Sequence, residues 1–226
     1  MNSPTDEYKY LKNLDNIRDV AYFTVFEKYM KYKLRGAEKA IQIDETDQES
    51  LIVSKNGGFP IPGFVYTFIY KGGDFKVGTP PEKVREYKDF VPLVFCMGVD
   101  QKSFIGINLN LLPESPRLQF LQKFYDTFPD FLKREADVLA ENQQLALNKR
   151  FIAYVKSGKG QEMIKLFSRA SGQNFGFGYR KYLFEKIENF RMIEYAEWKY
   201  IPFYDPKDAF RKLNQIQIYK LYGRSK

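Results

Sequence analysis

The chain has 226 residues and a formal net charge of +8, and it contains no histidine and a single cysteine. Without histidine there can be no Ser–His–Asp or Cys–His catalytic group and no histidine-ligated zinc site, and one cysteine excludes an internal disulfide. Phe and Tyr are abundant, with 21 and 17 copies, and the 44% hydrophobic content is enough for a sizeable core. No apolar run reaches the roughly 18 residues of a membrane-spanning helix, so we expect no membrane partner.

The first 50 residues predict an N-terminal helical arm with an acidic loop. Ser3 as the cap, Pro4 at the first helical position and Asp6 in the first turn favour a helix start. The acidic loop lies at residues 44–49, which read Asp-Glu-Thr-Asp-Gln-Glu. Its spacing does not match a calcium-binding loop, so we interpret it as a flexible acidic loop, with a divalent-ion site as the alternative.

Residues 51–226 predict a single α+β domain, with strands at about 64–109 and 191–203 and helices between and after them. Strand candidates rich in β-branched and aromatic residues lie at 64–70, 91–99 and 103–109. The second of these is apolar almost throughout, which indicates burial on both faces. A strand, a long charged loop and a hairpin favour a small SH3-like antiparallel barrel or a bent sheet with several flanking helices.

The remaining segments predict mainly helices. One helix is expected to begin at Pro116 after a Ser115 cap and to end at residues 127–129. Further helices are expected at 130–155, at 161–170 and at 180–190, with the Ser-Gly-Lys-Gly segment 157–160 as a turn between the first two. Residues 191–203 read as a late strand returning to the sheet, and Asp205 begins the last helix.

The positive charge is concentrated at one end of the chain. Residues 1–150 are neutral overall, so residues 151–226 carry the whole net charge of +8. This asymmetry indicates an acidic partner for the last third, either nucleic acid or an acidic protein surface, with a solvated basic face as the alternative. The candidate contacts are Lys156, Lys159, Lys165, Arg169, Arg180, Lys181, Arg211, Lys212, Lys220 and Arg224.

Other motifs point to no defined chemistry. The Ser-Gly-Lys-Gly segment lacks the remaining residues of a phosphate-binding loop. Residues 174–182 alternate glycines with aromatics before two basic residues, which suits either base stacking or, in better agreement with the residue order, a loop packed on the core or on another protein. Because no pair of carboxylates stands out as an acid and base, we expect no enzymatic activity, no catalytic residue, no metal and no cofactor.

One motif has a clear structural interpretation. Gly106 allows a strand to bend or a neighbouring backbone to approach, Asn108 can anchor that bend with side-chain hydrogen bonds, and Pro113 ends the strand before a helix. We therefore interpret the motif as a junction in the fold.

The same motif resembles a family of small proteins from tailed bacteriophages. That family reads Phe-Pro-Leu-Val, then Gly-x-Asn-Leu-x-Tyr-Leu-Pro with an Arg shortly after. Residues 91–95 (Val-Pro-Leu-Val-Phe), Gly106, Asn108, Pro113 and Arg117 resemble this pattern, whereas Leu111 replaces the aromatic residue. The resemblance extends to Tyr182-Leu183, to residues 197–202 and to the basic residues at 210–212, and it covers about 63–125 and 178–222.

The resemblance implies a virion or DNA-maturation protein made in the bacterial host cytoplasm. The first hypothesis is a structural subunit of the tail, baseplate or head–tail connector, located in the virion. It would contact other phage structural proteins in a symmetric multi-subunit assembly. The alternative hypothesis is a basic DNA-binding protein that acts on phage DNA or its ends.

Overall fold

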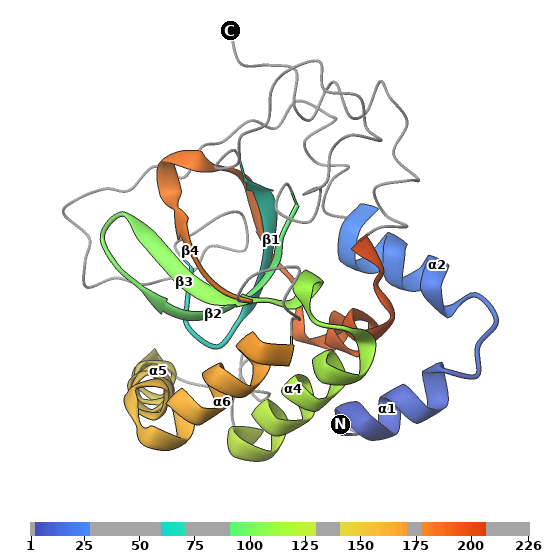
Figure 1. The fold of residues 1–226 in the computed structure, drawn as a ribbon, viewed down its shortest axis with the longest axis horizontal. Helices are drawn as coiled ribbons and strands as arrows, with labels where there is room; N and C mark the ends of the chain where they lie inside the picture. The colour runs from blue at the N-terminus through green and yellow to red at the C-terminus, as the bar shows by residue number, and fades with distance from the viewer. Residues whose placement is uncertain (1–2, 28–59, 71–90, 130–140, 171–177, 207–226) are drawn as a thin grey trace, which may run out of the picture.

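The structure is a computed structural model that describes residues 3–27, 60–70, 91–129, 141–170 and 178–206 (Figure 1). Its five strands are β1 (Val65–Tyr70), β2 (Leu93–Val99), β3 (Ser103–Asn108), β4 (Tyr179–Leu183) and β5 (Ile187–Met192). The α-helices are α1 (Pro4–Leu11), α2 (Ile17–Tyr22), α4 (Glu114–Thr127), α5 (Glu141–Lys156) and α6 (Gly158–Ala170). A π-helical turn, η1 (Phe23–Glu27), extends α2, and the 3₁₀ helices are η4 (Leu109–Leu111), η7 (Phe184–Lys186) and η8 (Tyr195–Phe203).

The strands form one antiparallel sheet in the order β4-β3-β2-β1-β5. If this sheet were flat, β4 and β5 would lie about 19 Å apart at its two edges. They are joined by only the three residues of η7, so the end of β4 and the start of β5 lie within about 14 Å. The sheet must therefore bend strongly, and register shifts in β2 and in the β1–β5 pairing are irregularities of the kind that bend strands.

Aromatic rings fill the inside of this bend. Phe104 in β3 and Phe190 in β5 have ring centroids 5.9 Å apart, although two strands separate them in the sheet. Phe68 in β1 and Tyr182 in β4, also separated by two strands, lie 5.2 Å apart. The bent-sheet form of the expected α+β fold is thus confirmed: the interior is closed by side chains, while the sheet itself is not closed into a barrel by strand pairing.

The outer face of the sheet carries the second and larger part of the core. Alternate residues such as Val65, Phe95 and Ile107 point to this face, where α4, α5, α6 and η8 cover them (Figure 1). Phe95 lies at the centre, with ring centroids 4.9 Å from Phe120 and 6.0 Å from Trp198. Strands β1 and β2 are buried on both faces along most of their length and contain few polar side chains, as the apolar run at 91–99 predicts, whereas the edge strand β4 is partly exposed and carries Arg180 and Lys181.

The N-terminal helices pack into the same core. Ser3 caps α1 by accepting a hydrogen bond from the Asp6 amide, and Pro4 occupies the first helical position, as the sequence predicts. The Tyr8 hydroxyl donates to Glu114 Oε1 at 2.6 Å, and the Tyr8 ring stacks on Phe203 at 4.9 Å. Contacts of α1 and α2 with α4 and η8 thus attach the first 27 residues to the domain. The boundary expected at residue 50 and the acidic loop at 44–49 lie outside the described residues.

Two expectations after residue 178 are wrong. The helix expected at 180–190 is instead β4, η7 and β5, because Tyr182, Phe184 and Phe190 all fill the interior of the bent sheet. The late strand expected at 191–203 continues β5 only to Met192, and Tyr195–Phe203 form η8. Apolar residues at intervals of three fit the three-residue turn of a 3₁₀ helix and place one row against the core, namely Tyr195, Trp198, Ile201 and Tyr204.

The boundaries of the remaining elements differ only slightly from the expectations. The strands begin and end within two residues of the expected positions. Helix α4 starts at Glu114 after Pro113, two residues before the expected Ser115–Pro116 start, and it ends at Thr127. The turn expected at 157–160 is wrong: only Ser157 separates α5 from α6, and residues 158–160 form the first turn of α6, three residues before the expected start at 161. Met163, Ile164 and Phe167 are buried on one face of α6, as expected. The segment 130–140 and the helix expected after Asp205 lie largely outside the described residues.

Candidate functional site

The junction motif begins at Gly106, in the middle of β3. Gly106 pairs with Cys96 on one side and with Arg180 on the other. A Cβ atom at this position would overlap the carbonyl oxygen of Phe95 and Cγ1 of Val94. Only glycine therefore lets β2 and β3 approach this closely, which is one of the two roles that the sequence suggests for it.

Asn108 and Asn110 turn the chain from β3 into η4. The Asn108 side-chain oxygen accepts a hydrogen bond from the backbone amide of Asn110 at 3.0 Å. The backbone amide of Asn108 donates to the Gly178 carbonyl at 2.7 Å. Asn110 Nδ2 donates to the Val91 carbonyl at 2.9 Å. Both side chains are buried, and these bonds satisfy Asn108 Oδ1 and Asn110 Nδ2, whereas the buried Asn110 Oδ1 has no hydrogen-bond partner.

Arg117 connects this junction to the end of η8. Its Nε donates to the Leu112 carbonyl at 2.6 Å, and its Nη1 donates to the carbonyls of Ile201, at 3.1 Å, and of Tyr204. Burial lowers the pKa of Arg117 to about 10, so the group stays protonated at neutral pH. The guanidinium thus holds together backbone segments more than 80 residues apart in the sequence. Sequence reasoning marked Arg117 only through the family resemblance, because its partners are main-chain atoms.

The motif residues are therefore occupied by contacts within the chain. Gly106 and Asn108 are fully buried, Arg117 is nearly so, and Pro113 marks the point where the chain enters α4. The Asn108 side-chain oxygen and the Arg117 guanidinium bond to backbone groups. Such an arrangement fixes the fold at the junction between β3 and α4.

The basic candidates fall into two places in the fold. Lys156, at the end of α5, and Lys159 and Lys165, in α6, are exposed. Arg180 and Lys181 lie on β4. Arg169 lies in the last turn of α6, where side chains are not described, and the other candidates lie outside the described residues: Arg211, Lys212, Lys220 and Arg224. The structure adds exposed Lys149 and Arg150 on α5, which the sequence analysis did not single out because they precede residue 151.

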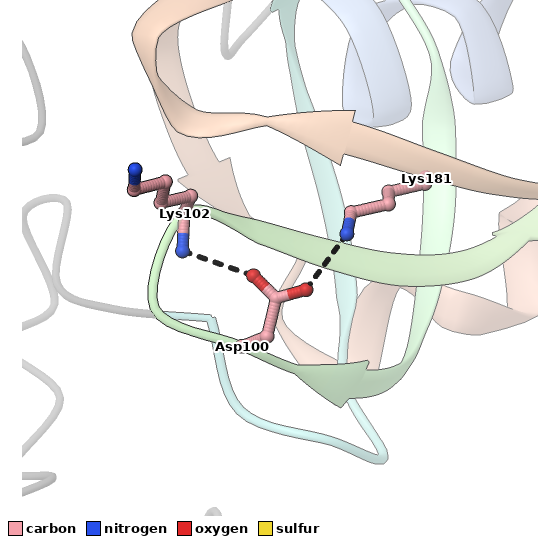
Figure 2. A network of polar contacts seen from close by, with 3 residues as sticks. All are labelled: Asp100, Lys102 and Lys181. Carbon is pink, nitrogen blue, oxygen red and sulfur yellow. Dashed lines mark hydrogen bonds and ion pairs between the residues drawn. The ribbon is translucent and has the colours of Figure 1, made fainter.

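Lys181 already has a partner at the tip of the β2–β3 hairpin (Figure 2). Its Nζ lies 2.9 Å from Asp100 Oδ2, while Asp100 Oδ1 accepts a hydrogen bond from the Lys102 amide at 2.9 Å. The nearby Ser103 hydroxyl, then Lys181 and the Lys102 amide, hold the pKa of Asp100 well below its usual range. The Ser103 hydroxyl makes no hydrogen bond of standard geometry, so we assign its effect to proximity of the hydroxyl to the carboxylate.

This pair reduces the charge that β4 offers to a partner. The side chains of Lys181 and Asp100 are 57% and 46% exposed, so the ion pair is worth less than about 1 kcal/mol. The two charges nevertheless neutralise each other at the surface. Among the sequence-derived candidates whose side chains are described, the exposed lysines other than Lys181 lie on the α5–α6 pair: Lys156, Lys159 and Lys165.

The glycine–aromatic segment is only partly described, from residue 178 onward. Tyr182 is almost fully buried and lies 5.3 Å from Phe104 in a stacked arrangement, so its ring belongs to the core. Tyr179 is half-buried against the outer face. This supports the core-packing interpretation for the described part of the segment and leaves Tyr182 no free face for a base.

The described residues contain no group of three or more His, Cys, Asp or Glu side chains that could hold a metal ion. Among the described helices, none combines the length and hydropathy needed to cross a membrane. Cys96 is fully buried, and burial raises the pKa of its thiol. Comparisons of the chain with protein-family models, curated proteins and solved structures find no match.

Proposed function

We propose that this protein is a structural subunit of a tailed-phage particle, in the tail, baseplate or head–tail connector, and that it acts through protein contacts. The observation that carries the proposal is the structural use of the motif that resembles the phage family. Gly106, Asn108 and Arg117 build a rigid junction between the sheet and the helical layer, and their polar groups serve the fold. A chain whose distinctive residues specify shape is suited to assembly.

The surface supports the same proposal. Large apolar side chains are exposed around the N-terminal helices, with Tyr10 70% and Phe23 48% accessible, and Leu14 lies between them in the sequence. Aromatic residues are enriched in the buried centres of protein interfaces. Most of the described Phe and Tyr side chains therefore pack in the two-part core, while the Tyr10 ring is largely exposed and suited to a contact with a neighbouring protein.

The test is mass spectrometry of purified particles of the phage whose genome encodes the chain. We expect the protein at a fixed copy number relative to the major capsid protein, consistent with a symmetric position. Its absence from particles, while it is abundant in infected cells, would refute the structural role.

A second candidate function, binding of phage DNA or its ends, is favoured by the exposed lysines of α5 and α6. If Lys156, Lys159 and Lys165 contact phosphates, the affinity for duplex DNA should fall steeply with salt, with a slope that decreases when these residues are changed to Gln. Binding that does not depend on salt, or no binding at about 50 mM salt, would exclude this candidate.

A further inference from the structure

The outward faces of α5 and α6 combine basic and apolar side chains. On α5, Lys149, Ile152, Ala153 and Lys156 are all exposed and follow the i, i+3, i+4, i+7 spacing of one helix face. On α6, the exposed residues Lys159, Glu162, Lys165 and Leu166 cluster opposite the buried row that contains Phe167. We call these two faces together the hairpin surface.

The two faces point away from the sheet. Phe151 of α5 packs on Phe95 and Phe124, and Phe167 of α6 packs on Phe120, so both helices bury one side in the same core. The helices contact each other as well as the sheet, and Figure 1 shows them beneath it. The sides opposite the buried rows are therefore presented to solvent together.

The charge on this surface is one-sided. Among the described side chains of the two faces, the charged residues are Lys149, Lys156, Lys159 and Lys165 and one acid, Glu162. Like charges this close repel one another, and an acidic partner would relieve that repulsion. Any partner must therefore supply negative groups.

The apolar residues decide between the two kinds of acidic partner. Ile152 and Leu166 are 36% and 57% exposed and lie among the lysines. Contacts to DNA phosphates are made by cationic and hydrogen-bonding groups, and an exposed Leu or Ile gains little from them. A protein surface with apolar residues framed by carboxylates would bury these side chains and pair the lysines at the same time.

We propose that the hairpin surface binds an acidic, amphipathic segment of a neighbouring protein, with Ile152 and Leu166 as apolar anchors and the lysines as a charged rim. This inference rests on the proposed structural role and names the partner chemistry of one contact. Rim charges mainly set association rate and salt dependence, whereas buried apolar anchors contribute most of the affinity. Apolar and charge substitutions should therefore have different effects.

The experiment measures binding of the full chain to three probes by fluorescence anisotropy. The first is a labelled 18-residue helical peptide with Leu on one face and Glu on its flanks, the second is the same peptide with Ser for Leu, and the third is a 20-base-pair DNA duplex. The variants are Ile152→Ser with Leu166→Ser, and Lys156→Gln with Lys159→Gln and Lys165→Gln. Their matched controls change exposed residues elsewhere: Tyr10→Ser with Phe23→Ser, and Lys9→Gln with Lys102→Gln and Lys123→Gln.

The apolar double variant should weaken binding of the Leu-containing peptide at least tenfold and change DNA binding less than twofold. The Ser-containing peptide should bind the unchanged chain as weakly as the Leu-containing peptide binds that variant. The lysine variant should bind the peptide more weakly than the unchanged chain, and its affinity should fall less steeply as salt is raised. The control variants should bind the peptide as the unchanged chain does. Unchanged emission of the buried Trp198 verifies that each variant is folded.

Two results would overturn the proposal. Equal binding of the two peptides would show that the apolar anchors do not act. DNA binding that is tighter than peptide binding and insensitive to the apolar variant would assign the surface to phosphates. Neither result bears on whether the protein is present in phage particles, so failure of this inference is distinguishable from failure of the proposed function.

Discussion

The close approach of β2 and β3 at Gly106 makes a sharp prediction for Gly106→Ala. Two atoms would overlap the new methyl group, and the third nearest, the Phe95 carbonyl carbon, lies only 3.1 Å from the Cβ position. Carbon atoms in contact are separated by about 3.5–4.0 Å, so the two strands must move apart where Gly106 pairs with Cys96. The obstacles are mainly backbone atoms of a central strand, so relaxation is limited.

We expect Gly106→Ala to lower the free energy of unfolding by about 3 kcal/mol, the upper part of the usual range for overpacking. For a domain of this size, this corresponds to a fall in Tm of about 6–12 °C. Urea unfolding followed by fluorescence of Trp198, the only tryptophan, measures the change where the helical layer packs on Phe95.

Gly98→Ala is the matched control on the neighbouring strand. A Cβ at Gly98 meets no atom within 4 Å, so this substitution should change stability by less than about 1 kcal/mol. If Gly106→Ala costs less than about 0.5 kcal/mol, or if both substitutions destabilise equally, the close-approach explanation is wrong.

Three further predictions concern other contacts. Arg117→Met should cost about 3 kcal/mol or more in urea unfolding, because the buried carbonyls that Arg117 joins lose their donor, and Arg117→Lys should recover only part of it. The hydrogen bond to Glu114 raises the pKa of Tyr8 to about 12, so its stabilisation is present below pH 10 and lost between about pH 10 and 12. Tyr8→Phe should remove that component of alkaline unfolding; an unchanged profile contradicts the assignment. Gly160→Ala should lower Tm, because its Cβ would overlap the Tyr154 carbonyl, whereas Gly158→Ala should not.

The junction motif and the basic surface support different parts of the proposed function. The motif from Gly106 to Arg117 is explained by geometry inside the chain, which agrees with the structural interpretation of these residues. The sequence assigns the positive charge to the last third of the chain, and the structure shows which of the described basic residues lie on the same part of the surface. Of the candidates whose side chains are described, Lys156, Lys159 and Lys165 share the α5–α6 hairpin, while Lys181 pairs with Asp100.

Local sequence determined those elements whose signals depend on neighbours in the chain. The Ser3–Pro4 start of α1, the apolar strand β2 and the buried face of α6 were predictable, because capping, β-branched residues and helical periodicity act over a few residues. The bent sheet was one of two forms that the sequence predicted, because a strand, a long charged loop and a hairpin suit either a small barrel or a bent sheet.

Only the tertiary structure decided the segments whose partners are distant in sequence. Residues 180–190 have apolar spacing that suits a helix, yet Tyr182 and Phe190 lie in strands because their rings pack inside the bent sheet. Arg117 has no sequence signal of its role, since its partners are the carbonyls of Ile201 and Tyr204. The sequence by itself determined that the last third is basic; which lysines share one exposed face with Ile152 and Leu166 depends on how α5 and α6 pack.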